Sequence, residues 1–156
     1  MARYDDLVNR FSTTKVGRVV GAKAAARIDP LVFKLTKGRY TSTGRPTLPL
    51  LALTTTGRRT GKRRTVQLAY VTDGDDRLVV ASNFGQEHHP AWSHNLDADP
   101  DAWILVDGSN VPVRAAVLSD EEKAQHWSRI EEVVPQMKVY PTLTDRNIRV
   151  YRLRPR

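Results

Sequence analysis

Short apolar segments joined by tight turn signals constrain the fold of this chain most. Strand patterns span residues 48–55, 65–72, 77–82, 102–106, 111–118 and 148–153. Asp73-Gly74 and Asp107-Gly108 stand between consecutive segments, and Asp-Gly pairs are typical of two-residue hairpin turns. Parallel strands need long crossover connections, for which most of these spacings leave no room. We therefore expect an α+β protein with an antiparallel barrel or half-open sheet of about six strands and peripheral helices.

The N-terminal part has a different pattern. Residues 4–28 carry an apolar stripe at helical spacing, flanked by Lys and Arg. Asp29-Pro30 is a typical start for a second, short helix. The sequence therefore predicts a basic N-terminal helical arm over residues 1–38 and a barrel domain over residues 39–156. Towards the C-terminus, the capping-box pair of Ser119 and Glu122 predicts a further helix.

Composition excludes several classes of function. The 156 residues include no cysteine, which rules out disulfides, thiolate zinc sites and a cysteine nucleophile. No apolar run reaches the roughly 20 residues needed to span a bilayer, and the first residues lack a signal-peptide core. We expect a cytoplasmic protein. The net charge is +8, but residues 1–45 hold ten Lys/Arg against three Asp/Glu. The nearly balanced remainder argues against a nucleic-acid-binding module, which stays the alternative for a basic chain.

One cluster stands out in that balanced remainder. Residues 57–64 read GRRTGKRR, with five cations and no acid. The segment superficially suggests a phosphate-binding P-loop. However, Lys62 is followed by Arg63 rather than Ser or Thr, and a strand pattern begins at Thr65. Nucleotide hydrolysis is therefore not predicted. Two glycines and several arginines still suit a bound anion such as phosphate.

A second informative stretch covers residues 81–96, ASNFGQEHHPAWSHNL. A polar turn follows a buried strand, and a proline then opens a short helix. Trp92 and Asn95 lie three apart on one face of that helix, which suits stacking and hydrogen bonding to a flat polar ligand. Trp92 is equally well explained as a core residue. The three histidines, His88, His89 and His94, lack the i, i+4 spacing of a zinc hydrolase, and no metal site is predicted.

Four motifs together resemble a known family. They are LTTTGRRTGKRR (Leu53–Arg64), LVVAS (Leu78–Ser82), HPAWSHNLDADP (His89–Pro100) and TDRNI (Thr144–Ile148). In this order they resemble the actinobacterial deazaflavin-dependent nitroreductase family, the group A of flavin/deazaflavin oxidoreductases. The resemblance implies a split β-barrel similar to the FMN-binding fold. It also implies binding of coenzyme F420, a deazaflavin with a phosphate and a glutamate tail.

The resemblance further implies which residues bind that coenzyme. The phosphate and tail would be held by Arg58, Arg59, Thr60 and Arg64. The ring would run beside Thr65, Val66 and Gln67. The backbone of Ala81, Ser82, Asn83 and Gly85 would line the coenzyme. The short helix with Pro90, Ala91, Trp92 and Asn95 would close over it.

The implied activity is hydride transfer from reduced F420 to a quinone, a nitroaromatic compound or another conjugated, electron-poor acceptor. Ser82 matches a serine that faces the substrate, and Tyr140 matches a tyrosine that caps it. Ala69, Val134 and Met137 replace tyrosines of the nitroimidazole-activating member, so we expect a more open, less hydrogen-bonding pocket and leave nitroimidazole activation open. Two alternatives on the same fold stay open: an FMN-dependent oxidoreductase and a coenzyme-binding protein without turnover.

The basic arm has two interpretations. An amphipathic basic helix can lie on an anionic membrane surface, where each cation contributes about 1 kcal/mol. A quinone reductase on the inner face of the cell membrane would find its substrate there. Alternatively, the helix packs on the barrel in the ordinary way.

Overall fold

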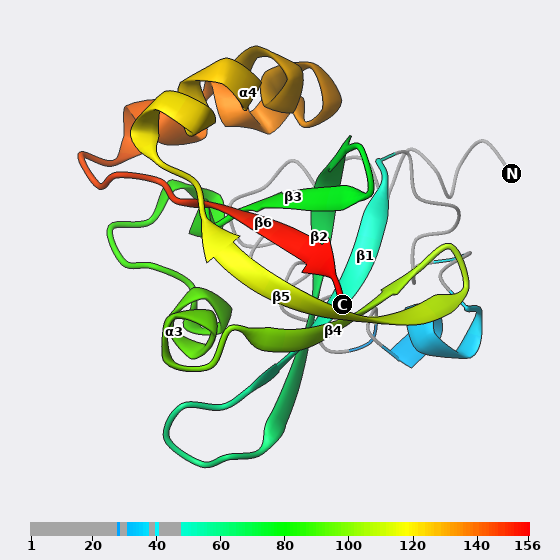
Figure 1. Ribbon diagram of the computed structural model, residues 1–156. Helices are drawn as coiled ribbons and strands as arrows, with labels where there is room; N and C mark the ends of the chain where they lie inside the picture. Colours follow the sequence, from blue (N-terminus) through cyan, green and yellow to red (C-terminus); the bar gives the residue numbers. More distant parts are fainter. Residues whose placement is uncertain (1–27, 29–30, 38–39, 41–47) are drawn as a thin grey trace, which may run out of the picture.

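A computed structural model describes residues 28, 31–37, 40 and 48–156. Six antiparallel strands form a closed barrel in the order β1-β2-β3-β6-β5-β4 (Figure 1). They are β1 (Leu50–Thr56), β2 (Arg63–Asp73), β3 (Asp76–Val80), β4 (Asp101–Val106), β5 (Ser109–Val117) and β6 (Val150–Pro155). The predicted antiparallel barrel is confirmed. Of the two forms predicted, the sheet takes the closed one, because β1 pairs with β4.

Tight turns join β2 to β3 and β4 to β5. Asp107 and Gly108 both have positive φ, 49° and 79°, as a two-residue hairpin turn requires. The other turn differs from the prediction by one residue. Asp73 pairs with Asp76, so it ends β2 and the loop begins at Gly74, whose φ is also positive. The final strand likewise begins two residues later than predicted.

The barrel encloses one apolar core and carries a second on its outer surface. Alternation along the strands sends Tyr70 and Val79 into the barrel and Val71 and Leu78 to the outside. Both faces are covered there, which explains why these segments are apolar at consecutive positions. The outer core supports one wall of the site described below.

Two helices cover these cores (Figure 1). Helix α3 (Ala91–Ala98) adds Trp92 and Leu96 to the inner core. Helix α4 (Asp120–Val133) adds Ile130 to the outer core. Three single-turn 3-10 helices follow strands or helices of the barrel domain: η1 (Asn83–Gly85), η2 (Pro135–Lys138) and η3 (Tyr140–Leu143). Both α3 and η1 belong to the connection between β3 and β4, which therefore shapes one end of the barrel.

The predicted capping box of α4 is confirmed. The Ser119 hydroxyl accepts a hydrogen bond from the Glu122 backbone N–H at 3.2 Å, and the Glu122 carboxylate accepts one from the Ser119 N–H at 3.0 Å. We expect Ser119→Ala to lower the free energy of unfolding by about 1 kcal/mol, measured by urea denaturation. Ser128→Ala, an exposed position within α4, serves as the control. Equal effects of the two substitutions would contradict a capping role.

The N-terminal predictions fall largely outside the described residues. These are the helix over residues 4–28 and the boundary between the arm of residues 1–38 and the domain of residues 39–156. Residues 31–35 are helical, and Phe33 is fully buried. No helix in the described ranges is long and apolar enough to cross a membrane.

Candidate functional site

The basic cluster forms the loop between β1 and β2. The loop is compact, because the Gly57 N–H donates to the Lys62 carbonyl at 2.8 Å and the Gly61 N–H donates to the Gly57 carbonyl at 2.7 Å. Gly61 has φ of 65°, a conformation that favours glycine. The loop projects from the barrel in Figure 1. Its fold directs exposed Arg58 and Arg59 outwards, without the helix that a P-loop would place after it.

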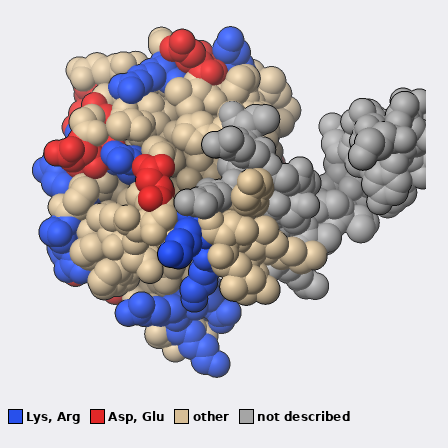
Figure 2. Space-filling model, turned by 90° about the vertical axis from the view of Figure 1, so that its right-hand side faces the viewer, with Lys and Arg blue, Asp and Glu red and all other residues tan. Residues whose placement is uncertain are grey.

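The cations of this loop have no acidic partners within the part of the chain that the structure describes. Figure 2 shows blue side chains gathered at the lower end of the molecule, where the β1–β2 loop projects. Over the upper part of the same face, red and blue lie side by side. An uncompensated cluster of this kind favours an anionic ligand.

Asn95 fastens this loop to α3. Its Oδ1 accepts a hydrogen bond from the Arg58 N–H at 3.1 Å, and its Nδ2 donates to the Thr55 hydroxyl at 3.0 Å. Asn95 is 7% exposed and Thr55 is 1% exposed. Each end of the amide therefore has a protein partner, and the residue positions the loop. The predicted hydrogen bond from Asn95 to a flat ligand stays a prediction, because the amide keeps a second N–H.

Removing this amide should weaken both the fold and the loop. We expect Asn95→Ala to lower the free energy of unfolding by about 1–3 kcal/mol, since it leaves the Thr55 hydroxyl and the Arg58 N–H without their partner. Urea denaturation measures the change, and Asn110→Ala, at an exposed position on β5, is the control. If the two variants are equally stable, the tether contributes nothing to the fold.

A wide cleft of about 820 Å³ lies between this loop and α3. Its walls are formed by Gly57, Arg58, Arg59, Thr60, Arg64, Thr65, Val66, Asn83, His88, His89, Pro90, Ala91, Trp92, His94 and Asn95. The arginines stand on the side of the β1–β2 loop, and the histidines come from the segment that leads into α3 and from α3 itself. The cleft is therefore strongly basic on the side of the loop.

A smaller, mainly apolar cleft of about 320 Å³ adjoins it. Four residues line both clefts: Val66, Asn83, Pro90 and Trp92. The smaller cleft is further lined by Leu48, Gln67, Leu68, Ala69, Val80, Ser82, Phe84, Val134, Gln136, Met137 and Tyr140. The shared residues place the two clefts side by side, with the arginines at the far side of one and the apolar wall at the far side of the other.

The structure brings nearly all the predicted site residues to these clefts. Two do not line them. Ala81 lies fully buried in the inner core, and Gly85 is buried against η3, where an added Cβ would lie 3.0 Å from Leu143. Trp92 is 7% exposed and packs edge-to-face on Tyr151, with ring centroids 5.4 Å apart. It is a core residue, as one of the two interpretations had it, whose remaining surface forms part of the wall.

Polar groups in the apolar cleft are few and distinctive. Among the described residues, the buried Nε2 of Gln67 has no hydrogen-bond partner, and a buried donor of this kind is destabilising unless something binds it. Burial raises the pKa of Tyr140, so its hydroxyl stays protonated at neutral pH. The Tyr140 ring packs edge-to-face on the Phe84 ring, with the ring centroids 6.2 Å apart. Ser82 adds a second hydroxyl, and Asn83 and Gln136 add two more amides, so the cleft offers three amides and two hydroxyls to a mostly apolar ligand.

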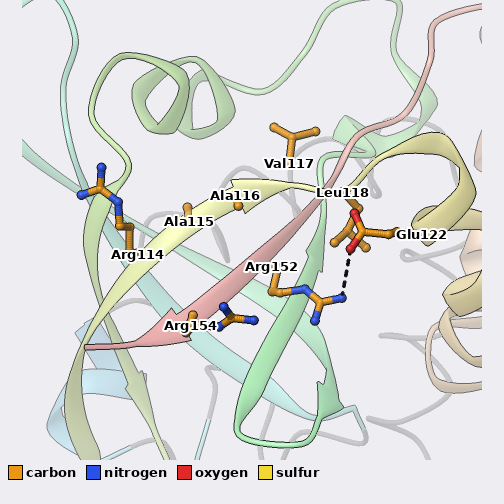
Figure 3. A pocket seen from close by; sticks show the side chains of 8 residues that line it. All are labelled: Arg114, Ala115, Ala116, Val117, Leu118, Glu122, Arg152 and Arg154. Atoms are coloured by element: carbon orange, nitrogen blue, oxygen red, sulfur yellow. Dashed lines mark ion pairs between the residues drawn. The ribbon is translucent and has the colours of Figure 1, made fainter.

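Another cavity, of about 340 Å³, lies outside the barrel beside β5, β6 and α4 (Figure 3). Arg152 and Arg154 line it, but their charges are already paired. Arg152 lies 3.1 Å from a carboxylate oxygen of Asp73, and Arg154 lies 3.2 Å from Asp76. The dashed line in Figure 3 marks a further pair between Arg152 and Glu122. These arginines form ion pairs within the protein, so their charges are largely compensated and do not favour an anionic ligand.

Sequence reasoning missed one residue near the site. Arg146 belongs to a motif that carried the family resemblance, but it had no assigned role. In the structure its guanidinium bonds to the segment of residues 81–89, which lines both clefts. Arg146 lies some sixty residues after the segment that it binds. No local sequence pattern links an arginine to a segment so remote in the chain.

Comparison with known proteins identifies the family. A model of the F420H(2)-dependent quinone reductase family matches residues 25–155. The chain belongs to this family. The resemblance seen in the sequence motifs is therefore confirmed, and with it the enzyme class and the coenzyme, because reductases of this family depend on reduced F420.

Individual relatives of the chain support the same family assignment. A Mycobacterium tuberculosis protein named as an F420H(2)-dependent quinone reductase is 38% identical over 112 residues, which cover 72% of this chain and 94% of that protein. A second one from the same species is 37% identical over 110 residues, covering 68% and 72%. A solved F420-H2 dependent reductase, FDR-A, is 34% identical with a TM-score of 0.62 and covers 67% of this chain and 93% of that one. The predicted split-barrel fold is thereby confirmed.

Proposed function

We propose that reduced F420 binds across the two joined clefts and passes a hydride to a quinone in the smaller one. The anionic end would lie at the β1–β2 loop, and the ring would lie against β2 near Val66 and Gln67. The observation that carries this proposal is that the two clefts adjoin, with arginines that no described acid pairs at one end and an apolar wall at the other.

The residues present fit the coenzyme on two counts. Its phosphate and glutamate carboxylates match the cations of the loop, because Arg58, Arg59 and Arg64 all line the wide cleft. Its polar ring matches the unpartnered Nε2 of Gln67, which can donate a hydrogen bond to a ring oxygen. Both features stand on neighbouring parts of the same hairpin, at a separation that an elongated coenzyme can span.

When bound, the reduced coenzyme supplies a hydride from a ring carbon to an electron-poor acceptor. The protein binds and orients the two partners, and its apolar wall keeps water from the hydride. The protonated Tyr140 hydroxyl can donate a hydrogen bond to the acceptor oxygen on which negative charge develops. Ser82 offers a second hydroxyl on the same cleft wall. Solvent supplies the proton that completes two-electron reduction of a quinone to a hydroquinone.

The lining of the smaller cleft favours a flat, apolar acceptor. Ala69, Val134 and Met137 surround Tyr140 with aliphatic groups that cannot donate hydrogen bonds. A quinone presents an apolar ring and two carbonyl acceptors, which match such a wall with few donors. The acceptor that best fits these residues is therefore a quinone rather than a heavily hydrogen-bonded polar ring.

Turnover of reduced F420 with menadione tests this function. We expect the absorbance of the oxidised coenzyme to return only when protein and menadione are both present. Tyr140→Phe should raise KM for menadione and leave the Kd of F420 unchanged, because the hydroxyl serves the acceptor. Tight coenzyme binding without any oxidation by quinones would refute the proposed reaction. Copurified FMN, visible as a yellow colour, would point to the alternative cofactor.

A further inference from the structure

Arg146 makes a concentrated set of contacts just behind the clefts. Its Nη1 donates to the Ala81 carbonyl at 3.0 Å, its Nη2 donates to the Ser82 carbonyl at 2.7 Å, and its Nε donates to the Gln86 carbonyl at 3.1 Å. Nη1 also lies 3.0 Å from Nδ1 of His89. The lining of neither cleft includes Arg146 itself. One side chain thus holds four points on a single loop.

That loop contains a strained turn. Asn83 and Phe84 have φ of 45° and 56°, and Gly85 follows at 74°. Left-handed backbone is unfavourable for residues with a side chain, especially a bulky one, and it persists only where the surroundings enforce it. Phe84 is 69% exposed, so its own packing contributes little. The guanidinium binds backbone oxygens on both sides of the turn, Ser82 before it and Gln86 after it.

We propose that Arg146 is a positioning residue of the active site, which clamps the strained turn of residues 82–86 in the shape that both clefts require. The inference deepens the proposed function and rests on it, because the clamped segment supplies walls to both clefts. Asn83 lines both of them, Ser82 lines the acceptor side, and His89 lines the coenzyme side.

The same contact fixes the chemistry of His89. An arginine has only donors, so Nδ1 of His89 must accept and the ring proton must lie on Nε2. Burial, together with the charges of Arg149 and Arg146, lowers the pKa of His89; His94 acts in the same direction and Asp97 opposes it. The imidazole is therefore neutral at neutral pH. It gives the basic cleft an N–H donor whose tautomer depends on the clamp.

Arginine is the side chain that these acceptors demand. Its planar fork carries five N–H donors in fixed directions, whereas lysine offers one compact ammonium on a flexible stem. Arg146→Lys keeps the charge but cannot reach all four acceptors at once. This substitution therefore separates the clamp from the simple presence of a cation.

The test uses the full chain with Arg146→Lys and Arg146→Ala, and the exposed α4 substitution Arg129→Ala as a control. The Kd of F420 is measured by fluorescence quenching, kcat with menadione by absorbance, and the His89 tautomer by nitrogen NMR. For Arg146→Lys we expect Kd to rise about ten-fold, because carbonyl groups that lose their donors no longer hold the turn that lines the coenzyme cleft. We also expect kcat to fall and the Nε2–H preference of His89 to disappear. Added guanidinium should partly restore binding in Arg146→Ala.

The possible outcomes test the role of Arg146 separately from the proposed reaction. A folded Arg146→Lys protein with wild-type Kd, kcat and His89 tautomer would overturn the inference. If both variants fail to fold, the wild-type spectrum decides: Nε2–H supports the clamp, whereas Nδ1–H or a protonated ring refutes it. If the wild-type protein does not oxidise reduced F420 at all, the proposed function fails. The tautomer and F420 binding in the variants still test the clamp in that case.

Discussion

Replacing Arg64 by alanine weakens F420 binding by about 10- to 100-fold, because a charge-assisted hydrogen bond contributes roughly 1.5–3 kcal/mol and each 1.4 kcal/mol is a factor of ten. Arg64 stands near the start of β2, opposite Thr55 of β1, and lines the wide cleft. No acid pairs with it within the described residues, so its guanidinium is available to the phosphate or the tail. Fluorescence quenching of the deazaflavin measures the Kd directly.

The neighbouring residue provides a matched control. Arg63 has the same charge and the same exposed strand end, but it does not line the cleft. We expect Arg63→Ala to change the Kd only slightly, through long-range attraction that salt screens. The difference between the two variants should survive at moderate ionic strength. Equal weakening by both would mean that the overall charge of the loop matters and that no specific contact exists.

Local patterns in the sequence were enough to predict the barrel and the basic loop. Apolar alternation and turn pairs are properties of neighbouring residues, so they locate strands without knowledge of the fold. Only the ends shifted. Asp73 joined β2 because its pairing with Asp76 depends on register, which the residues of one strand do not fix. The basic loop was visible for the same reason, since residues 57–64 contain five cations and no acid.

The roles of Asn95 and Arg146 could not be predicted because their partners are remote in the chain. Asn95 binds Thr55, forty residues earlier, and Arg146 binds Ala81, sixty-five residues earlier. Each role depends on the tertiary fold, which brings α3 to the β1–β2 loop and the segment before β6 to the residues that follow β3. Helical spacing predicts which face of a helix carries a polar residue such as Asn95. Only the tertiary fold decides whether that face contacts a ligand or another part of the protein.

Trp92 shows how the core and the site share one side chain, and its removal should have the largest effect on stability. We expect Trp92→Ala to lower the free energy of unfolding by about 3–5 kcal/mol, because it empties a large part of the inner core. The ring is 7% exposed and packs against Tyr151, which closes the barrel from β6. Trp103→Ala is the control, because Trp103 is 40% exposed on β4 and should contribute much less.

A milder substitution separates the two roles of the indole. Trp92→Phe keeps an aromatic ring on Tyr151, so we expect it to fold and to lose far less stability than Trp92→Ala. Trp92 also lines both clefts, and the smaller ring should widen the border between them, where we propose that coenzyme and acceptor meet. The rate of menadione reduction by Trp92→Phe should therefore fall clearly, while its free energy of unfolding should stay close to that of the wild-type protein. Urea denaturation and the rate of coenzyme oxidation measure the two effects on the same protein. A fully active Trp92→Phe variant would restrict the indole to the core and would place the reacting partners elsewhere along the cleft.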